Sequence, residues 1–377
     1  MDTLDSADAL EEIVSGVVEP MAAQVDREGV FPRAAVTALG EAGFLGLTSQ
    51  AELGGGGKGL GEAAAVVERI SQACGSTGMV MVMHYSAVAL LSGYAPGDVL
   101  QAIASGRHLT TLAYSEVGSR SHFWVPLSSA TADGDKVRLS ARKSFATSAG
   151  EADSYVWSSR PMAVDGAMTL WYVPADTPGV EVAGGFDGLG LRGNASRPIR
   201  ADNAAIPAEW MLGADGAGMD ITMQTALPWF LVLNAAFSVG LMRAALATTI
   251  AHVTATRLEH LGQSLAEQPL TRFDIGRMQI EVDRGRALLA DTIAALGSNR
   301  DDAMLRVLEV KAAAAEAAIA VTDLAMKVAG GAAFRKDLGL ERQFRDSRAA
   351  RVMSPTTDRL TDFVGRVVCG LPLLDGS

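Results

Sequence analysis

Hydrophobic and polar positions alternate differently in three successive parts of the chain. Residues 1–108 are rich in alanine and leucine, and their apolar residues recur at helical spacing, as in MVMVMHYSAVALLSGY at 79–94. Residues 109–215 instead carry short runs typical of β-strands, separated by turn residues. Helical spacing returns at 216–377. This order predicts an α+β protein with an N-terminal helical domain, a small central β-sheet domain and a C-terminal helical domain.

Turn and cap residues locate several boundaries. Asp133-Gly134, in TADGDKVRLS, predicts a hairpin, and SYVWSS at 154–159 predicts a further strand. Gly330-Gly331 predicts the end of an alanine-rich helix, whereas the glycine run at 54–57 predicts a flexible loop. Pro355 predicts a break at 353–356, because proline lacks an N–H and disfavours helix in the residue before it. Thr356 or Thr357 would then cap the last helix.

Composition narrows the class of protein. The chain has 377 residues, 49% of them hydrophobic, and its net charge of −11 argues against nucleic-acid or anionic-membrane partners. Its two cysteines cannot form a disulfide framework, and the acidic N-terminus does not resemble a signal peptide, so we expect a cytoplasmic protein. The apolar stretch at 226–246 is expected to be a buried bundle helix rather than a membrane span. Histidine and cysteine spacing predicts no metal site.

Four stretches carry a resemblance to a known family. They are SQACGSTGMVMVMHYSAVALL at 71–91, LAYSEVGSRS at 112–121, ARKSFATSAGEADSYVW at 141–157 and AMKVAGGAAFRKDLGLERQFRDSRAARV at 325–352. In this order and spacing they resemble the acyl-CoA dehydrogenase superfamily over nearly the whole chain. The resemblance implies the same domain order, with a C-terminal four-helix bundle. It also implies an oxidoreductase that binds FAD, with FMN also compatible.

The resemblance also implies which residues hold the flavin. The expected cofactor-binding residues are Tyr114, Ser115, Ser121, Phe145, Thr147, Arg257, Lys327, Gly330, Gly331 and Thr356. Several of them have ordinary alternatives. Ser115 can belong to a simple strand-to-loop turn, Gly330 to a helix cap, and Lys327 can be a solvated side chain. Arg257 suits a pyrophosphate through its bidentate fork, or it can pair with a surface carboxylate.

The family's usual catalytic base is missing from this sequence. Desaturation of an acyl thioester needs a carboxylate over the α-carbon, usually the Glu of a Tyr-Glu-Gly-Thr loop. Counting from Arg345-Asp346, that Glu aligns with Ser354 and the Thr with Thr356. Some relatives place the base on another helix, where this chain has Phe230 and no acidic residue between Asp220 and Glu259. The resemblance therefore indicates an atypical member.

Three other residues are alternative acids or bases. Asp358 is a candidate for a relocated base, or it caps the helix that follows Ser354. His122 and His84 can titrate near neutral pH, or they are ordinary half-exposed or core histidines. Trp229, Phe230 and His84 are expected to line an apolar substrate pocket, with core packing as the alternative for the aromatic pair.

These observations lead to one main functional hypothesis and two alternatives. The main hypothesis is an FAD-binding oxidoreductase that acts on an acyl-CoA, an acyl-carrier thioester or another small apolar substrate. The alternatives are a flavin-dependent monooxygenase that uses reduced flavin and O2, and a non-catalytic flavin- or acyl-CoA-binding subunit. We expect a homotetramer or homodimer, with an electron-transfer flavoprotein or a flavin reductase as redox partner, and neither nucleic acid nor membrane as a partner.

Overall fold

The computed structural model describes residues 3–119 and 122–374 and divides the chain into two compact units. The first unit contains Met1–Val66, Ser76–Gly188 and Arg192–Phe230. The second unit contains Val67–Gly75, Leu189–Leu191 and Leu231–Ser377. The sequence-based division at 108 and 215 remains a prediction.

The first unit begins with helices. They are α1 (Thr3–Ile13), α2 (Glu19–Glu28), α3 (Arg33–Glu41), α4 (Leu60–Ala73), α5 (Gly75–Leu91) and α6 (Gly97–Ala104). The end of α4, from Val67 on, and the first residue of α5 belong to the second unit. A π-helical turn, Val14–Val18, joins α1 to α2, and a 3-10 turn, Ala51–Leu53, precedes α4. The apolar residues of α5 are buried almost throughout, which explains why this helix shows no polar face in the sequence.

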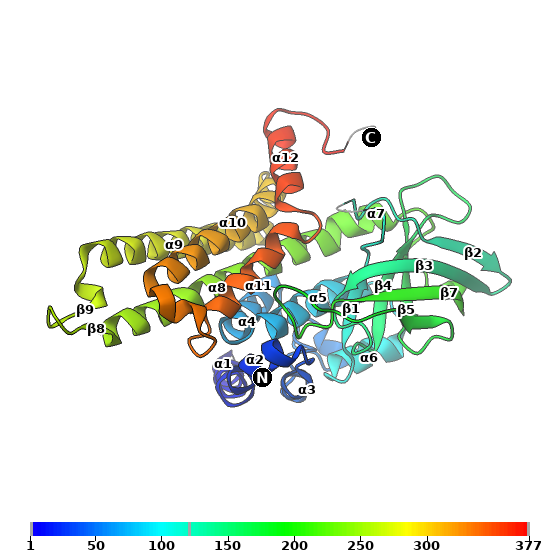
Figure 1. Cartoon of the computed structure of the whole chain (residues 1–377). Helices are drawn as coiled ribbons and strands as arrows, with labels where there is room; N and C mark the ends of the chain where they lie inside the picture. The colour runs from blue at the N-terminus through cyan, green and yellow to red at the C-terminus, as the bar shows by residue number, and fades with distance from the viewer. Residues whose placement is uncertain (1–2, 120–121, 375–377) are drawn as a thin grey trace. The chain divides into compact units, whose positions relative to one another are not determined.

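Two sheets follow these helices. The first has the order β1-β4-β5, formed by Thr110–Ala113, Ser154–Ser159 and Thr169–Pro174. The second is antiparallel with the order β2-β3-β7-β6, formed by Ser129–Asp133, Lys136–Ala146, Arg197–Pro207 and Val180–Val182. In Figure 1, β3 and β7 run side by side, as their long ladder requires. Strands β1 and β4 are buried along their whole lengths, so the first sheet is part of the core.

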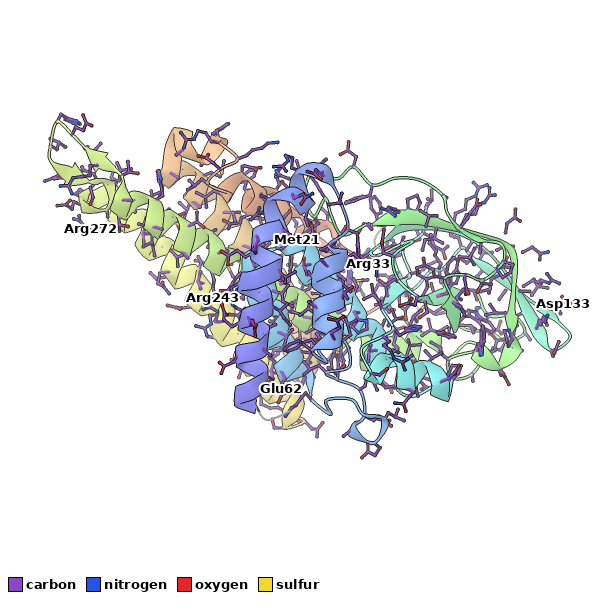
Figure 2. The ribbon with its side chains drawn as sticks, turned by 90° about the horizontal axis from the view of Figure 1, so that it is seen from below. Met21, Arg33, Glu62, Asp133, Arg243 and Arg272 are labelled. Atoms are coloured by element: carbon purple, nitrogen blue, oxygen red, sulfur yellow. The ribbon has the colours of Figure 1, made fainter. Side chains whose placement is uncertain are left out.

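The predicted hairpin is confirmed. Asp133 pairs with Lys136, so Gly134 and Asp135 form the two-residue turn, and Gly134 has a φ of 64°. Figure 2 shows Asp133 at the far end of this hairpin. The predicted strand at 154–159 is β4 itself.

The second unit is helical. It contains most of α8 (Leu227–Ala255), then α9 (Pro269–Gly297), α10 (Ala303–Ala329), α11 (Leu340–Val352) and α12 (Thr357–Val368). A small ribbon, β8 (Arg257–Leu258) with β9 (Gln263–Ser264), joins α8 to α9. Helix α10 packs against α9, α11 and α12, and Figure 1 shows α9 and α10 side by side. This arrangement confirms the expected helical bundle.

Glycine lets the helices of the second unit approach closely. A Cβ added to Gly240 of α8 would lie 2.4 Å from the Glu68 carbonyl oxygen of α4, and one added to Gly285 of α9 would lie 2.9 Å from Met242. The two positions therefore require glycine for packing. Two segments, Gly218–Ala255 and Ala303–Phe334, are long and apolar enough to cross a membrane by length and composition alone. The most apolar part of the first is 89% buried inside the chain, as expected for a core helix.

Candidate active-site segments

A buried ion pair fixes the loop after β1 in the first unit. Lys143 of β3 and Glu116 of the loop are both buried, and Lys143 Nζ lies 2.5 Å from Glu116 Oε1. The same ammonium group donates to the carbonyl oxygen of Ser158 at 2.7 Å and to its hydroxyl at 2.9 Å. Burial lowers the pKa of Lys143 to about 8, against the opposing effect of the Glu116 charge.

Glu116 also holds the far end of this loop. Its Oε2 accepts the N–H groups of Leu127 at 2.6 Å and Ser128 at 2.9 Å, and Oε1 accepts the Ser128 hydroxyl. One carboxylate therefore joins the start of this loop, at Glu116 next to the predicted site residue Ser115, to its far end at Leu127 and Ser128. Neither Glu116 nor Lys143 was among the residues predicted from the sequence. The sequence did carry a signal for a buried lysine, because Lys143 is an even number of residues from Val137 and Leu139 in β3. Side chains at such spacing point to the same, buried face of the strand.

The predicted flavin-loop residues have different surroundings. Tyr114 is half-buried, its hydroxyl lies 3.2 Å from Thr222 Oγ1, and burial raises its pKa. Ser115 is half-buried, and its carbonyl oxygen accepts the Ser144 N–H at 2.8 Å. His122 is half-buried, with Nδ1 3.3 Å from the Ser119 carbonyl oxygen and its ring edge-on to Trp124. Ser121 lies outside the described residues.

A β-bulge presents Phe145 to the outside of the first unit. Between Lys143 and Ala146 the β3–β7 register shifts by one residue, and Phe145 has a φ of 52°. Its side chain is 71% exposed, whereas Thr147 is buried with its hydroxyl 3.1 Å from Ser196 Oγ. A bulky residue at positive φ is strained, and such strain is common at functional sites. The bulge therefore orients an aromatic ring outward beside a buried hydroxyl.

In the second unit, the predicted break between the last two helices is confirmed. Helix α11 ends at Val352 and α12 begins at Thr357. Fully buried Lys311 of α10 lies below the intervening loop, and its ammonium group donates to the carbonyl oxygens of Met353 at 2.8 Å and Pro355 at 2.7 Å. Burial lowers the pKa of Lys311 to about 7. Lys311 therefore fixes the backbone on both sides of half-buried Ser354.

The residues after Ser354 begin the last helix. The Thr356 hydroxyl accepts the Arg359 N–H at 3.4 Å, which makes it the N-cap of α12. Its O–H can still act as a donor, as the family's flavin contact would require. Asp358 is exposed in the first turn of α12, where a carboxylate favours the positive end of the helix dipole.

Other predicted cofactor-binding residues lie in the second unit, and two of them have partners there. Lys327 Nζ lies 2.7 Å from Asp274 Oδ2, whose side chain is only 6% exposed. The Lys327 side chain is itself 67% exposed, so it is a solvent-facing lysine that pairs with a buried carboxylate. Arg257 in β8 donates to the Gly262 carbonyl oxygen at 2.7 Å. Gly330 is the C-cap of α10, as predicted, and no atom lies within 4 Å of a Cβ built on Gly330 or Gly331.

His84 is a hydrogen-bonded residue of the core. It is fully buried, Nδ1 accepts the Thr110 N–H at 3.2 Å, and Nε2 lies 2.8 Å from the Leu45 carbonyl oxygen. Because both nitrogens are used, His84 is held as a neutral core residue, and burial lowers its pKa to about 4. These contacts favour the alternative of an ordinary core histidine over an acid, a base or a pocket residue. In the first turn of α8, Trp229 is half-buried and Phe230 buried.

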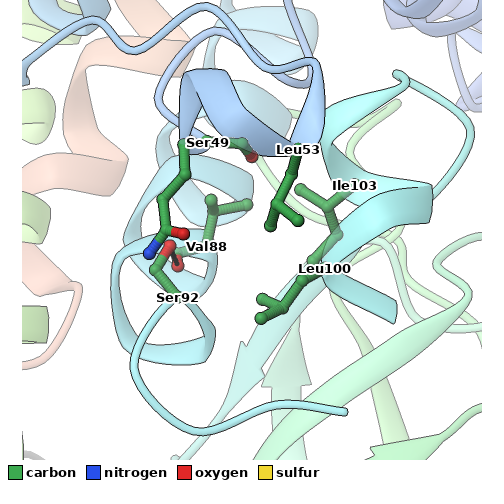
Figure 3. Close-up of a pocket in the computed structure, with 7 residues that line it drawn as sticks. Ser49, Leu53, Val88, Ser92, Leu100 and Ile103 are labelled. Carbon is green, nitrogen blue, oxygen red and sulfur yellow. Dashed lines mark hydrogen bonds between the residues drawn. The ribbon is translucent and has the colours of Figure 1, made fainter. Parts of the chain in front are cut away.

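The first unit also contains a pocket that is lined by none of the predicted site residues. It is lined by Ser49, Gln50, Leu53, Val88, Ser92, Leu100 and Ile103 (Figure 3). It has about 220 Å³ of empty volume, including space open to solvent. None of the predicted site residues is among these lining residues. In the described part of the chain, no group of three or more histidine, cysteine, aspartate or glutamate side chains could hold a metal ion.

Comparisons with known proteins agree along the chain. Family models described as the acyl-CoA dehydrogenase N-terminal, middle and C-terminal domains match residues 2–97, 111–204 and 216–369. The mitochondrial short-chain specific acyl-CoA dehydrogenase of Bos taurus is 31% identical over 346 residues, which cover 90% of this chain and 83% of the relative.

Solved structures show the same fold. Butyryl-CoA dehydrogenase from Megasphaera elsdenii matches with a TM-score of 0.91 and 19% identity, covering 98% of this chain and 100% of that one. A structure described as the FAD complex of PigA matches with a TM-score of 0.88 and 20% identity, covering 98% and 100%. The similarity therefore covers both units of this chain.

Proposed function

Because the chain belongs to the acyl-CoA dehydrogenase family, we propose that it oxidises an acyl thioester without the carboxylate base usual at the loop before the last helix. The protein is a flavin-dependent oxidoreductase, and its cofactor is FAD. The observation that carries the finer proposal is Ser354, a neutral residue on a loop whose backbone Lys311 holds on both sides.

The residues present fit a flavin. In the first unit, the exposed Phe145 ring would offer a stacking surface, and its strained φ is explained if a planar ligand rests on it. In the second unit, Gly330 and Gly331 leave open space for close approach of a ligand, and the Thr356 O–H can donate to it. When bound, FAD supplies the two-electron acceptor of the reaction.

The chain's own groups then determine how the substrate proton is handled. A serine hydroxyl cannot replace a carboxylate as the base that removes an α-proton. The proton must therefore pass to another group, and Asp358 and His122 remain the candidates from the sequence. Lys311 contributes by positioning, because its two hydrogen bonds hold Met353 and Pro355 and thereby orient the residue between them.

The test restores the missing carboxylate. We expect Ser354→Glu to increase anaerobic bleaching of the flavin by acyl-CoA thioesters about 10²–10⁴-fold, the range typical of a positioned acid or base. Ser354→Gln has the same length without the charge and serves as the matched control. Equal rates in the two variants would contradict a thioester whose α-carbon lies at this loop.

A flavin-dependent monooxygenase is the second candidate. It is favoured by Ser354 together with the lack of acidic residues between Asp220 and Glu259, since reduced flavin and O2 react without a base for an α-proton. If every thioester leaves the flavin oxidised in the wild-type protein, the next measurement is rapid mixing of the reduced protein with O2. Transfer of an oxygen atom from O2 to an added substrate would then favour this candidate.

A non-catalytic subunit is the third candidate. It is favoured by two departures from the family's pattern, because Lys327 stands where the family usually has a glutamine and Ala333 where it usually has a glycine. Retention of FAD without reduction by thioesters or reaction with O2 would favour this reading. Recovery of activity on adding a homologous chain that carries the Glu would establish it.

A further inference from the structure

One buried side chain of α8 has a polar atom that its surroundings do not satisfy. By contrast, the buried hydroxyl groups of Ser238 and Thr249 in this helix donate to carbonyl oxygens one turn earlier. Ser238 bonds to Asn234 at 3.0 Å and Thr249 to Ala245 at 2.7 Å. Asn234 is fully buried, and its Nδ2 lies 3.8 Å from Met353 Sδ, a weak acceptor. Its Oδ1 has no hydrogen-bond partner among the described residues.

An unpaired buried oxygen destabilises a fold, and an apolar side chain of the same shape would avoid this cost. The rest of the apolar stretch at 231–237 is Leu, Val, Ala and Phe, so an apolar residue would suit position 234. The amide is therefore better explained by a partner that the chain itself does not provide.

The position of Asn234 indicates what that partner is. Its contact, Met353, directly precedes Ser354 on the loop. Lys311 holds the Met353 and Pro355 carbonyl oxygens of that loop. Asn234 thus adjoins the segment that the proposed function places beside the reacting carbons of the thioester.

We propose that Asn234 Oδ1 accepts a hydrogen bond from a hydroxyl or amino group on the acyl part of the substrate. The amide oxygen is an acceptor only, so the matching substrate atom must be a donor. Asn234 is then a specificity-determining residue, and the substrates are hydroxyacyl or aminoacyl thioesters rather than plain acyl thioesters. This inference rests on the proposed function. A site built to bond a donor discriminates strongly against analogues that lack it.

The test measures binding to the full-length, FAD-loaded protein under anaerobic conditions through perturbation of the flavin absorbance. The probes are butyryl-CoA and its 2-, 3- and 4-hydroxy and 2-, 3- and 4-amino derivatives. We expect at least one donor-bearing probe to bind about tenfold or more tightly than butyryl-CoA, a difference of about 1.4 kcal/mol. The hydroxy and amino series identify the kind of donor.

Variants assign the preference to Asn234. Asn234→Leu should bring the affinities for the donor-bearing probe and butyryl-CoA to within about twofold of each other. The melting temperature should not fall, because the substitution removes an unpaired buried polar group. Asn234→Asp, which keeps an acceptor, should retain the preference. Ser238→Ala is the matched control. Ser238 lies one turn further along α8, and its hydroxyl bonds to a backbone carbonyl oxygen, so this variant should behave like wild type.

Each contrary result has a distinct meaning. Equal binding of all probes to the wild-type protein overturns the role of Asn234 and leaves the proposed function standing. A preference for donor-bearing probes that survives in Asn234→Leu also overturns the role of Asn234. A lower melting temperature in that variant overturns it too, in favour of a structural role for the amide. If no thioester perturbs the flavin in any variant, the proposed function fails and this inference fails with it.

Discussion

Two buried lysines, one in each unit, hold the two loops that carry predicted active-site residues, and they do so differently. Lys143 lies under the loop at 114–128 and is paired with the Glu116 carboxylate. Lys311 lies under the loop at 353–356 and donates to the carbonyl oxygens of Met353 and Pro355. Burial lowers the pKa of both, to about 8 for Lys143 and about 7 for Lys311.

The difference teaches what each loop requires of its lysine. The Glu116 carboxylate needs a compensating charge, because a lone buried charge is very costly. The two loop carbonyl groups need only donors, and a neutral amine still has two N–H groups. We therefore expect the first loop to depend on the ammonium charge and the second to tolerate loss of that charge.

The largest effect is expected from Lys143→Met. This substitution leaves Glu116 buried without its ammonium partner, and breaking a buried pair in this way costs about 3–5 kcal/mol. We expect a clear fall in melting temperature, measured by circular dichroism, together with loss of bound FAD, measured by the ratio of flavin to protein absorbance. The FAD loss follows because the loop would no longer be fixed at both ends.

Lys136→Met is the matched control for this variant. Lys136 lies in the same strand but is exposed, so its substitution should change stability by less than about 0.5 kcal/mol. The double variant Glu116→Leu/Lys143→Met should be more stable than Lys143→Met, since it removes the unpaired charge. Equal melting temperatures for Lys143→Met and Lys136→Met would contradict the role assigned to the ion pair.

A smaller effect, with a pH dependence, is expected from Lys311→Met. Loss of donors to two buried carbonyl groups should cost about 1–3 kcal/mol at alkaline pH. Below pH 7 the lysine is protonated in both the folded and the unfolded chain, and the cost of burying its charge is fully present. As the pH rises from about 7 towards 10.5, the folded protein loses the proton first, so the wild type gains stability.

The measurement is denaturation of wild type and Lys311→Met at several pH values within this window. The wild-type advantage should grow with pH, because the methionine side chain of the variant cannot titrate. Both proteins keep Lys143, so its own titration cancels in the difference between them. An advantage that stays constant or shrinks as the pH rises would contradict a depressed pKa for Lys311.

Features that depend on neighbouring residues could be predicted from the sequence. The hairpin turn at Gly134, the cap at Gly330 and the break before Pro355 all depend on residues within a few positions of one another. Local backbone preferences determine such features. The spacing of apolar residues likewise predicted the order of helical, β and helical domains, and the resemblance to a family added the four-helix bundle and the cofactor.

Features built from distant residues could not be predicted in the same way. The ion pair of Lys143 with Glu116 joins residues 27 positions apart, and Lys311 reaches a carbonyl group 42 positions away. Only the folded chain brings these groups together. The glycine run at 54–57 shows a related limit, because a Cβ on Gly55 would lie 2.5 Å from the Ser49 carbonyl oxygen. Close packing, rather than flexibility alone, explains glycine there.

The smallest effect is expected at Thr356, which caps α12 and is also proposed to contact the flavin. Thr356→Ala removes the hydroxyl that accepts the Arg359 N–H, and loss of an N-cap typically costs about 1 kcal/mol. In a chain of this size that corresponds to a fall of roughly 2–4 °C in melting temperature. Differential scanning calorimetry of the FAD-free protein measures this cost without the cofactor.

Two further substitutions separate the roles of Thr356. Thr356→Ser keeps both the cap and the hydroxyl and should match wild type in melting temperature and flavin spectrum. Thr356→Asn keeps a capping oxygen but loses the hydroxyl, so it should restore the melting temperature while the spectrum of bound FAD still differs. A wild-type flavin spectrum in Thr356→Asn would confine Thr356 to capping. The second loop would then meet the cofactor, if at all, through other groups, and Lys311 would serve mainly to orient Ser354.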